Sequence, residues 1–533
     1  MLYFDAHACI GQRPQKHKRT RWSTEHLLED MHLAEVSGAL ISHALAHSFD
    51  PMYGNNRLAQ EIEKAPDRLF PVWCILPLGS VDFYSTEREM LGAMEAADVR
   101  AVRLVRGNYS LHEAVMGDTF IALEEAQILT LLSMGWAGED PFAFFHELLD
   151  RHPRLPVLLT DHVWSQQRHV HRLMQLHENL HIEFSAYQIN RGIESYAAEF
   201  GDERLVFGTG GTEKSPGAAR TYIDYAQLSA ESKERIAGGN LRRLLGGQGP
   251  LVEASEGRPE DRCIAEARRG IPQSTFVFDA HAHVLPEGKQ GAGPNYIMLG
   301  GDAAGMVEVN HWCGIDRIAM MSWHGPVCTD AEDGNEVVWR AMQRYGDEIL
   351  GVAVIDPTHM KDADIRAEID LRYREQGFVG LKPYVHMNLS YEDVGFMPWW
   401  AFGDAHRLYA LMHVAPHTGG VAGVGRLAER FPNMSWIIAH AGGSYAFAEE
   451  VASCIVEHPN VYAELTLTPV TNRVVEYLVE ATDDEHVLFG TDAPMRDPRQ
   501  QLGWVLWADL PMESKGKVLG LNFKRIVDRA LRP

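Results

Sequence analysis

The chain has 533 residues, of which 45% are hydrophobic, and a formal net charge of −24. This length and apolar content suffice for two full cores, each of the size at which an α/β barrel forms one domain. The negative charge argues against nucleic acid or an anionic membrane as a partner, because such surfaces would repel the protein. No apolar run is long enough to span a bilayer, and the first predicted strand begins at Leu2, which leaves no room for a cleaved signal peptide.

Cysteine usage adds a prediction about the compartment. The six cysteines are scattered and show neither a paired framework nor Cys-x-x-Cys spacing. This pattern is typical of a reducing compartment, so we expect a cytoplasmic protein. The expected partner is a small-molecule substrate, and a homo-oligomer is left open.

The most informative feature is an internal duplication. Residues 278–283 read Phe-Asp-Ala-His-Ala-His, and residues 4–9 read Phe-Asp-Ala-His-Ala-Cys. Near the ends of the two halves, Val-Leu-Phe-Gly-Thr-Asp (487–492) mirrors Val-Phe-Gly-Thr-Gly (206–210). The offset between the copies is almost constant, which indicates that a whole domain is repeated.

Short apolar runs alternate with amphipathic stretches in both halves, which is the pattern of repeated βα units. In the first half we predict strands at 2–6, 38–43, 69–75, 99–105, 128–133, 155–160, 180–185 and 204–208. In the second half we predict strands at 276–281, 315–321, 349–355, 378–384, 409–414, 435–440, 461–466 and 486–491, with helices such as 333–346, 362–376 and 444–457.

Eight strands in each half predict an α/β fold of two tandem (β/α)8 TIM-like barrels. We place the first barrel at residues 1–248 and the second at 276–533. The segment 249–275, rich in Gly, Glu, Arg and Pro, is then the linker, with a short helix around 260–269.

Metal-ligand residue types gather at the predicted strand ends of the second half, namely Asp279, His281, His283, His413, His440 and Asp492. The carboxyl ends of barrel strands converge on one face, and two histidines spaced i, i+2 on a strand point to the same side. Three imidazoles and one carboxylate with room for water suit one divalent ion, zinc first and manganese or iron second.

Two positions allow more than one interpretation. His413 competes with His417 as a ligand, and we favour His413 because it directly follows the apolar run. Lys382 ends the fourth predicted strand, where it is a carbamylated bridging ligand, a binder of substrate carboxylate or a structural cation. The bridging role is disfavoured, because a second metal would need more ligands than the sequence offers.

These motifs together resemble the amidohydrolase superfamily, in its amidohydrolase-related branch, also called amidohydrolase 2. The resemblance is carried by Asp-Ala-His-Ala-His (279–283), Gly-Leu-Lys-Pro (380–383), Ile-Ile-Ala-His-Ala-Gly-Gly (437–443), Phe-Gly-Thr-Asp-Ala-Pro (489–494) and Asn522. That branch includes aminocarboxymuconate semialdehyde decarboxylase, resorcylate decarboxylases and pyrone dicarboxylate lactonase. The match covers nearly all of 276–530 and is weaker but continuous over 1–245.

The resemblance implies a distorted TIM barrel with one metal bound by His281, His283, His413 and Asp492. It places His440 over the substrate as a catalytic residue. Asp492 is the second expected catalytic residue, because a cation lowers the pKa of bound water toward neutrality and an adjacent carboxylate can take its proton.

The first half departs from this pattern at nearly every catalytic position. It retains Asp5 and His7, but the other positions carry Cys9 for His283, Arg103 for Lys382, Ser133 for His413, Asp161 for His440 and Gly210 for Asp492. Two residual ligands cannot hold a catalytic metal, so we interpret this half as a pseudo-domain with a structural or regulatory role. A relict site for some other ligand is the alternative.

The substrate pocket is less defined by sequence. The expected substrate contacts are Lys382, His324, Tyr384, His386, His417 and Arg496. The loop 322–328 and the pair Trp399–Trp400 place aromatic rings where they can wall a pocket for a planar or apolar molecule, although helix packing explains the tryptophan pair equally well.

Three functions follow, in order of preference. The first is metal-dependent hydrolysis of a C–N or C–O bond, as in an amide or lactone. The second is non-oxidative decarboxylation of an aromatic or unsaturated acid, which needs the same ligand set. The third, a non-catalytic binding protein, is disfavoured by the intact second site.

Overall fold

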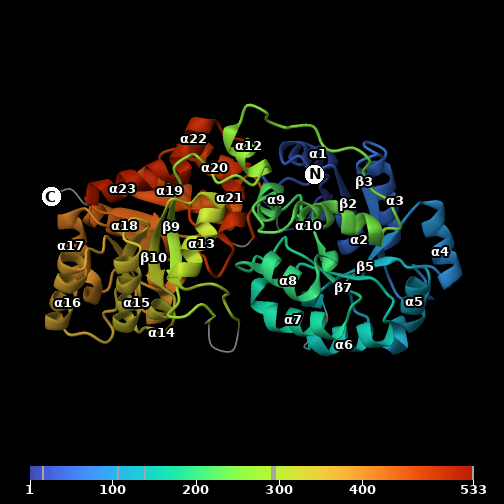
Figure 1. Cartoon of the computed structure of the whole chain (residues 1–533), viewed down its shortest axis with the longest axis horizontal. Helices are drawn as coiled ribbons and strands as arrows, with labels where there is room; N and C mark the ends of the chain where they lie inside the picture. The colour runs from blue at the N-terminus through green and yellow to red at the C-terminus, as the bar shows by residue number, and fades with distance from the viewer. Residues whose placement is uncertain (15–16, 105–106, 137–139, 290–295, 468, 531–533) are drawn as a thin grey trace. The chain divides into compact units, whose positions relative to one another are not determined.

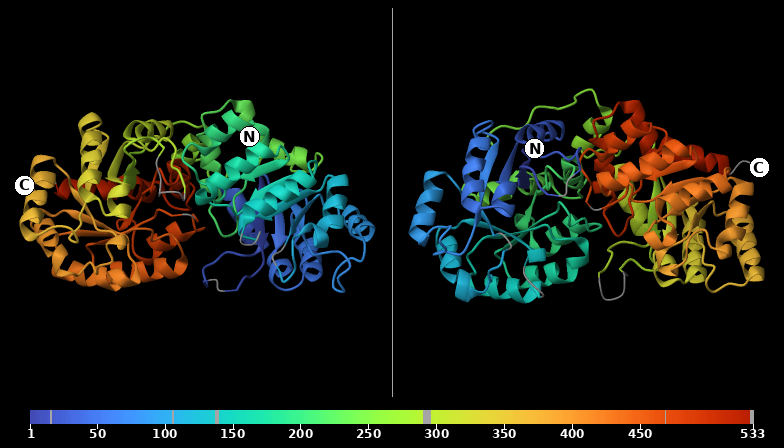
Figure 2. Two further views of the ribbon diagram at one scale, coloured as in Figure 1. Left: turned by 90° about the horizontal axis from the view of Figure 1, so that it is seen from below. Right: turned by 180° about the vertical axis from the view of Figure 1, so that it is seen from behind.

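The structure is a computed structural model that describes residues 1–14, 17–104, 107–136, 140–289, 296–467 and 469–530. The chain separates into two compact units. The first comprises Met1–Gln188 and Gly192–Pro259, and the second comprises Ile189–Arg191 and Glu260–Pro533. In each unit the helices lie on the outside of the strands (Figures 1 and 2).

The first unit contains one eight-stranded parallel sheet in sequential order. Its strands are β1 (Phe4–Ile10), β2 (Gly38–His43), β3 (Leu69–Ile75), β4 (Ala101–Leu104), β5 (Leu129–Ser133), β6 (Val157–Thr160), β7 (Leu180–Glu183) and β8 (Leu205–Val206). Its helices are α1 (Thr24–Leu33), α2 (Ala44–Ser48), α3 (Pro51–Ile62), α4 (Glu87–Ala96), α5 (Glu113–Glu125), α6 (Pro141–Arg151), α7 (Gln167–Leu176), α8 (Gly192–Phe200), α9 (Pro216–Asp224), α10 (Ala230–Glu234) and α11 (Asn240–Leu244).

The second unit repeats this order. Its strands are β9 (Phe278–Val284), β10 (Arg317–Ser322), β11 (Ile349–Val354), β12 (Gly380–Lys382), β13 (Tyr409–Met412), β14 (Ser435–Ile438), β15 (Val461–Glu464) and β16 (Val487–Leu488). Its helices are α12 (Arg262–Arg268), α13 (Ala303–Cys313), α14 (His324–Cys328), α15 (Ala331–Arg344), α16 (Asp362–Ile369), α17 (Met397–His406), α18 (Gly420–Arg430), α19 (Tyr445–Glu457), α20 (Val474–Ala481), α21 (Pro498–Leu506), α22 (Met512–Gly516) and α23 (Asn522–Ala530).

Both sheets close into barrels through backbone hydrogen bonds between the first strand and the segment of the last. In the second unit Ala280 N donates to Phe489 O at 3.0 Å, and in the first Ala6 N donates to Phe207 O at 2.9 Å. The prediction of two tandem (β/α)8 barrels is therefore confirmed. The last residue of the expected strand 99–105 lies outside the described residues.

The first strand of each barrel starts and ends later than expected, and it contains a β-bulge. Asp279 pairs with Ile318 and Ala282 with Met320, so β9 holds one extra residue between two paired positions. The same shift occurs after Asp5 in β1. A bulge of this kind re-aims side chains next to a site. His281 and His283 consequently lie within β9 and not at its end.

The core of each barrel is apolar and is sealed at one end by the last helix. In the second barrel Phe523 of α23 packs against Phe278 and Tyr409, with ring centroids 4.7 and 5.2 Å apart. The buried amide of Asn522 donates to the carbonyls of Asp484 and Val487. Asn240 makes the equivalent pair of bonds in the first barrel, so this closing asparagine fixes helix to barrel in both copies.

The structure corrects one local expectation and decides between the two interpretations of the tryptophan pair. Most of the expected loop 322–328 is helix α14. Trp399 and Trp400 of α17 are fully buried, and Trp400 packs on Trp436 and Phe396 while its Nε1 donates to a carbonyl. They are core residues, because full burial of two indole rings removes a large apolar area from water. No helix in the described ranges has the length and apolarity that crossing a membrane requires.

The buried indole of Trp400 gives a test of this packing. We expect Trp400→Ala to lower the free energy of unfolding of the second barrel by about 3–5 kcal/mol, because it leaves a large cavity. Trp22, which is 39% exposed, is the matched control, and Trp22→Ala should cost about 1 kcal/mol or less. Urea unfolding followed by circular dichroism measures both, and equal losses would contradict the assignment of Trp400 to the core.

Candidate metal centre

The metal-ligand residue types of the second barrel are brought together by the contact between its first and last strands. The buried carboxylate of Asp279 accepts hydrogen bonds from the backbone N–H groups of His281 and Thr491 and from Thr491 Oγ1. This clamp ties β9, which carries His281 and His283, to the segment after β16, which carries Asp492. Residues more than two hundred positions apart therefore meet at one end of the barrel.

The tightest group consists of His281, His283 and Asp492. Nε2 of His283 lies 3.0 Å and Nε2 of His281 lies 3.6 Å from Oδ1 of Asp492. One ligand atom from each of the three residues lies within 4.8 Å of the others. All three side chains are buried, so the cluster is shielded from bulk water.

Hydrogen bonds on the far side of each ring assign the tautomers of the first two histidines. Nδ1 of His283 lies 3.2 Å from the carbonyl oxygen of Ser322, which can only accept, so Nδ1 carries the proton. Nδ1 of His281 donates to Glu464 at 3.0 Å. Each ring therefore directs its Nε2 toward Asp492. Lone pairs that face a carboxylate at this range need a proton or a cation between them.

The same reasoning applies to His440 and His413. His440 Nδ1 lies 2.8 Å from the carbonyl of Thr466, so it donates there, and its Nε2 accepts from Nδ1 of His413 at 3.1 Å. His413 consequently has its Nε2 lone pair free for a metal. His440 belongs to a second group with His281 and Glu464, whose ligand atoms also lie within 4.8 Å of one another.

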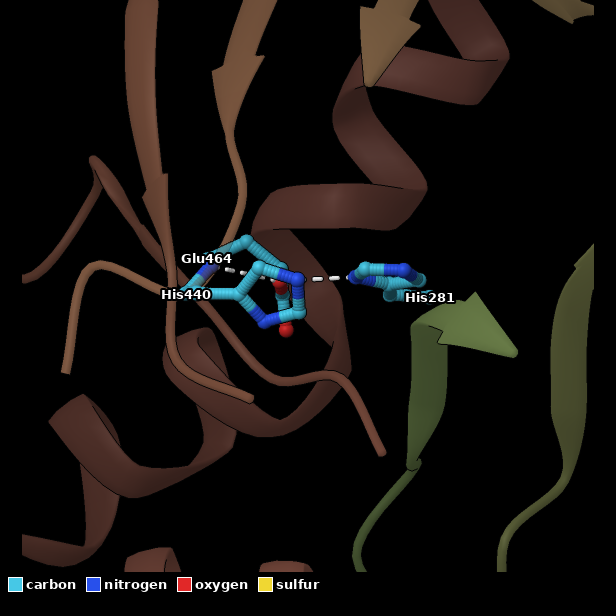
Figure 3. Close-up of side chains that lie close together, drawn as sticks. All are labelled: His281, His440 and Glu464. Atoms are coloured by element: carbon cyan, nitrogen blue, oxygen red, sulfur yellow. Dashed lines mark hydrogen bonds and ion pairs between the residues drawn. The ribbon is translucent and has the colours of Figure 1, made fainter. Parts of the chain in front are cut away.

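Figure 3 shows this second group. His281 comes from β9, whereas His440 and Glu464 come from neighbouring segments after β14 and at the end of β15. Glu464 lies between the two histidines and accepts from His281 Nδ1 and, at 3.3 Å, from the backbone N–H of His440. One buried carboxylate thus contacts the imidazole of His281 and the backbone of His440.

Charge at the centre is set by burial and by two cations. Burial raises the pKa of Asp492. The Arg496 guanidinium, His283 and His281 together lower it by more, so the pKa of Asp492 is held well below its usual range. Arg496 Nη1 donates to Oδ2 of Asp492. Burial, with Arg496 and Lys382 nearby, lowers the pKa of His440 to about 4, and this imidazole is neutral at physiological pH.

Lys382 is a fully buried cation at the end of β12, and its Nζ has no hydrogen-bond partner among the described residues. Burial lowers its pKa to about 8, although Asp492 and Glu464 oppose the shift. A buried ammonium without a partner is costly. A ligand that carries a hydrogen-bond acceptor could supply the missing partner of Lys382 Nζ.

The structure places some of the remaining predicted substrate contacts beside the centre and gives others different partners. Tyr384 packs edge-on against His413, with ring centroids 5.3 Å apart, so it lies beside the centre. His417 is exposed and contacts the carbonyl of Val385, and His386 contacts the carbonyl of Val327. His324 pairs with Asp333 at 2.8 Å. Of the aromatic residues expected near the pocket, Trp323 packs edge-on against His283.

Glu464 was missed by the sequence reasoning, yet the duplication contains a signal for it. Glu183 occupies the same place at the end of β7, and its carboxylate lies 3.5 Å from Nδ1 of His7. A glutamate retained in both copies beside a retained histidine indicates a partner that orients the ring. Burial raises the pKa of Glu464 to about 8, and a divalent cation on the far side of His281 would favour its carboxylate form.

The donor set fits one divalent ion. His281, His283 and Asp492 offer two imidazole nitrogens and a carboxylate oxygen, each oriented by a further hydrogen bond. His413 belongs to neither group of converging atoms, but its Nδ1 donates to His440 and its Nε2 lone pair stays available to an ion. Nitrogen and oxygen donors of this kind are those of zinc, manganese and iron sites.

Comparison with known proteins assigns the family. One family model, described as Amidohydrolase, matches residues 28–247 and again 278–529. The chain therefore belongs to the amidohydrolase family and contains the domain twice in tandem, as the sequence motifs predicted. No curated protein matches it.

Solved structures resemble about half of the chain each. A 5-carboxyvanillate decarboxylase from Sphingomonas paucimobilis is 15% identical with a TM-score of 0.38, covering 48% of this chain and 99% of its own. A 4-oxalomesaconate hydratase from Rhodopseudomonas palustris is 16% identical with a TM-score of 0.36, covering 48% and 96%. A dihydroxybenzoic acid decarboxylase from a Polaromonas species, with bound manganese, is 12% identical with a TM-score of 0.38, covering 48% and 97%.

The converging lone pairs predict one divalent ion per chain. We expect Asp492→Asn and His283→Ala to reduce its occupancy after dialysis far below one, and Glu464→Gln to weaken binding by about 10–100-fold through loss of ring orientation. Elemental analysis of the purified protein and its variants measures this.

The matched pair His413→Ala and His417→Ala separates the two candidate histidines. His413→Ala should lower metal occupancy, whereas His417→Ala should not, because His417 is exposed and contacts only a carbonyl in the structure. Two ions per chain would contradict a mononuclear centre, and no ion in protein never treated with a chelator would contradict the site altogether.

Proposed function

We propose that this member of the amidohydrolase family is a metal-dependent hydrolase that cleaves a C–N or C–O bond in a small molecule carrying an acidic group. The observation that carries the proposal is the convergence of the Nε2 atoms of His281 and His283 on Asp492. A divalent ion held there, zinc first and manganese or iron second, supplies Lewis acidity. Family membership supports an enzyme, and the buried donors supply its centre.

Hydrolysis is favoured because the protein groups around the centre are bases. His440 is a neutral imidazole, and Asp492 is held as a carboxylate by Arg496. Hydrolysis requires a group that takes a proton from water. Asp492 is the better acceptor of the two through Oδ1, since Arg496 occupies only Oδ2, whereas both ring nitrogens of His440 are already hydrogen-bonded. The Lys382 ammonium, which has no hydrogen-bond partner among the described residues, would receive the acidic group of the substrate.

Decarboxylation is the second candidate, and one observation favours it. This reaction needs an acid that protonates carbon after carbon dioxide leaves. Lys382, with a pKa near 8 and no hydrogen-bond partner among the described residues, is a proton donor suited to neutral pH. In that case Arg496 would hold the substrate carboxylate in its place.

The first barrel, in this proposal, does not perform the same reaction. Cys9 and Gly210 stand where the second barrel has His283 and Asp492, so the donor cluster cannot form there. No group of three metal-ligand residues converges in the described part of this barrel. We assign it a supporting or regulatory role.

Isotope labelling distinguishes the two reactions. Lactones and amides, hydroxybenzoates and unsaturated acids would be screened with metal-loaded protein in heavy-oxygen water and in deuterium oxide. A hydrolase should place heavy oxygen in the product without releasing carbon dioxide. Carbon dioxide release with deuterium on carbon would reverse the order of the two candidates.

The duplication supplies a matched pair of variants for the catalytic role. His440 and Asp161 follow equivalent strands, and both have positive φ angles, 65° and 54°. We expect His440→Ala to lower kcat by at least about 100-fold, because the imidazole expected over the substrate is lost. Asp161→Ala should leave kcat nearly unchanged. Loss of turnover in Asp161→Ala would show that the first barrel contributes to the reaction.

A further inference from the structure

A second pocket lies at the corresponding end of the first barrel. Its volume is about 280 Å³, and its wall includes Cys9, Arg13, His47, Arg103, Asp161 and Lys214. Cys9 occupies the strand position at which the second barrel has His283, and the backbone N–H of each donates to the segment after the last strand. The barrel that lacks the metal donors therefore places a thiol at the same point of its mouth.

Cationic groups surround this thiol. Arg13 Nη2 donates to the carbonyl of Cys9 at 2.9 Å and pairs with Glu213, and His47 of α2 contacts Ser42 Oγ at 2.9 Å. Burial would raise the pKa of the Cys9 thiol, but Arg13 and His47 outweigh it and lower the pKa to about 5. Burial would lower the pKa of His47, but Cys74 and Cys9 raise it to about 10. The Cys9 thiol and the His47 imidazole thus line one pocket, and Cys9 Sγ also lies 3.7 Å from the carbonyl oxygen of Ile10.

The opposite wall is also cationic but loosely paired. Asp161 lies 3.5 Å from Arg103, 3.8 Å from Lys214 and 3.4 Å from His7. Charge-assisted contacts of full strength measure about 2.7–2.9 Å. The Lys214 ammonium, on a flexible side chain, can therefore turn toward an incoming anion, whereas the buried Glu183 beside His7 holds that ring in place.

The other cysteines differ from Cys9 because each is either buried or exposed. Cys74, Cys263, Cys313 and Cys454 are buried, and Cys328 is exposed. Cys9 is half-buried and lines a pocket with cations on two sides. Reactive cysteines occupy electropositive, partly exposed surroundings of this kind, and inert ones are buried.

We propose that the mouth of the first barrel is a covalent modification site, in which the sulfur of Cys9 is the nucleophile and the pocket prefers small electrophiles that carry a carboxylate. With an α-halo acid, the sulfur lone pair forms an S–C bond while the carbon–halogen bond breaks. The halide leaves with the bonding pair. The thiol proton passes to solvent when the sulfur ionises, and Arg103 and Lys214 receive the carboxylate.

The test is competitive alkylation of the full chain with iodoacetate and iodoacetamide at pH 6, quantified by mass spectrometry of each cysteine peptide. Cys9 should react about tenfold faster than Cys328, since its larger thiolate fraction outweighs the lower nucleophilicity of a low-pKa thiolate. The ratio of iodoacetate to iodoacetamide labelling should also be higher at Cys9 than at Cys328. Equal rates at the two cysteines, or the same ratio at both, would overturn the proposal.

Variants separate the two walls of the pocket. Arg13→Gln should slow both reagents at Cys9, whereas Arg103→Met should slow iodoacetate alone. Arg172→Met, on the exposed face of α7, should change neither. The four buried cysteines report on folding in the same experiment, because they stay unlabelled while the barrel is folded. Should Arg103→Met expose them, Arg103→Lys tests the carboxylate preference with the charge retained, and an unchanged preference is expected.

Discussion

The buried clamp between Asp279 and Thr491 is the contact on which the second barrel's site depends. The clamp joins the first strand of the barrel to the segment after the last strand. Oδ1 of Asp279 accepts hydrogen bonds from the backbone N–H groups of His281 and Thr491. Burial raises the pKa of Asp279 to about 7, and the three hydrogen bonds from Thr491 and His281 oppose that shift. Without this carboxylate, two backbone donors would be buried without partners, and β9 would no longer be fixed against Asp492.

The first barrel retains the clamp and has lost the metal donors. Asp5 accepts from the backbone of His7 and Thr209 and from Thr209 Oγ1, as Asp279 does in the second barrel. The scaffold is therefore independent of the chemistry at its mouth. Where one copy gathers imidazoles around a carboxylate, the other gathers cations around a carboxylate and a thiol. The same strand ends thus support two electrostatic environments.

Backbone carbonyls and one glutamate decide which nitrogen each histidine offers. The carbonyls of Ser322 and Thr466 fix the protons of His283 and His440, and Glu464 fixes that of His281. Every residue type has a backbone carbonyl, so no sequence motif indicates which carbonyl fixes the proton of a histidine. Only Glu464 left a trace in the sequence, through its counterpart Glu183 in the other copy.

The sequence by itself determined the duplication, the two (β/α)8 barrels and the residues that gather at the strand ends, because apolar periodicity and strand order suffice for a barrel. Tertiary structure decided what depends on long-range geometry. It brought His413 into hydrogen-bond contact with His440, paired Arg496 with Asp492 and left Lys382 buried without a hydrogen-bond partner in the described chain. It also buried Trp399 and Trp400, since a predicted helix does not reveal which face its neighbours cover. Spacing along the chain shows which residues share a strand end, but the distances and partners that set their charge arise only when the barrel closes.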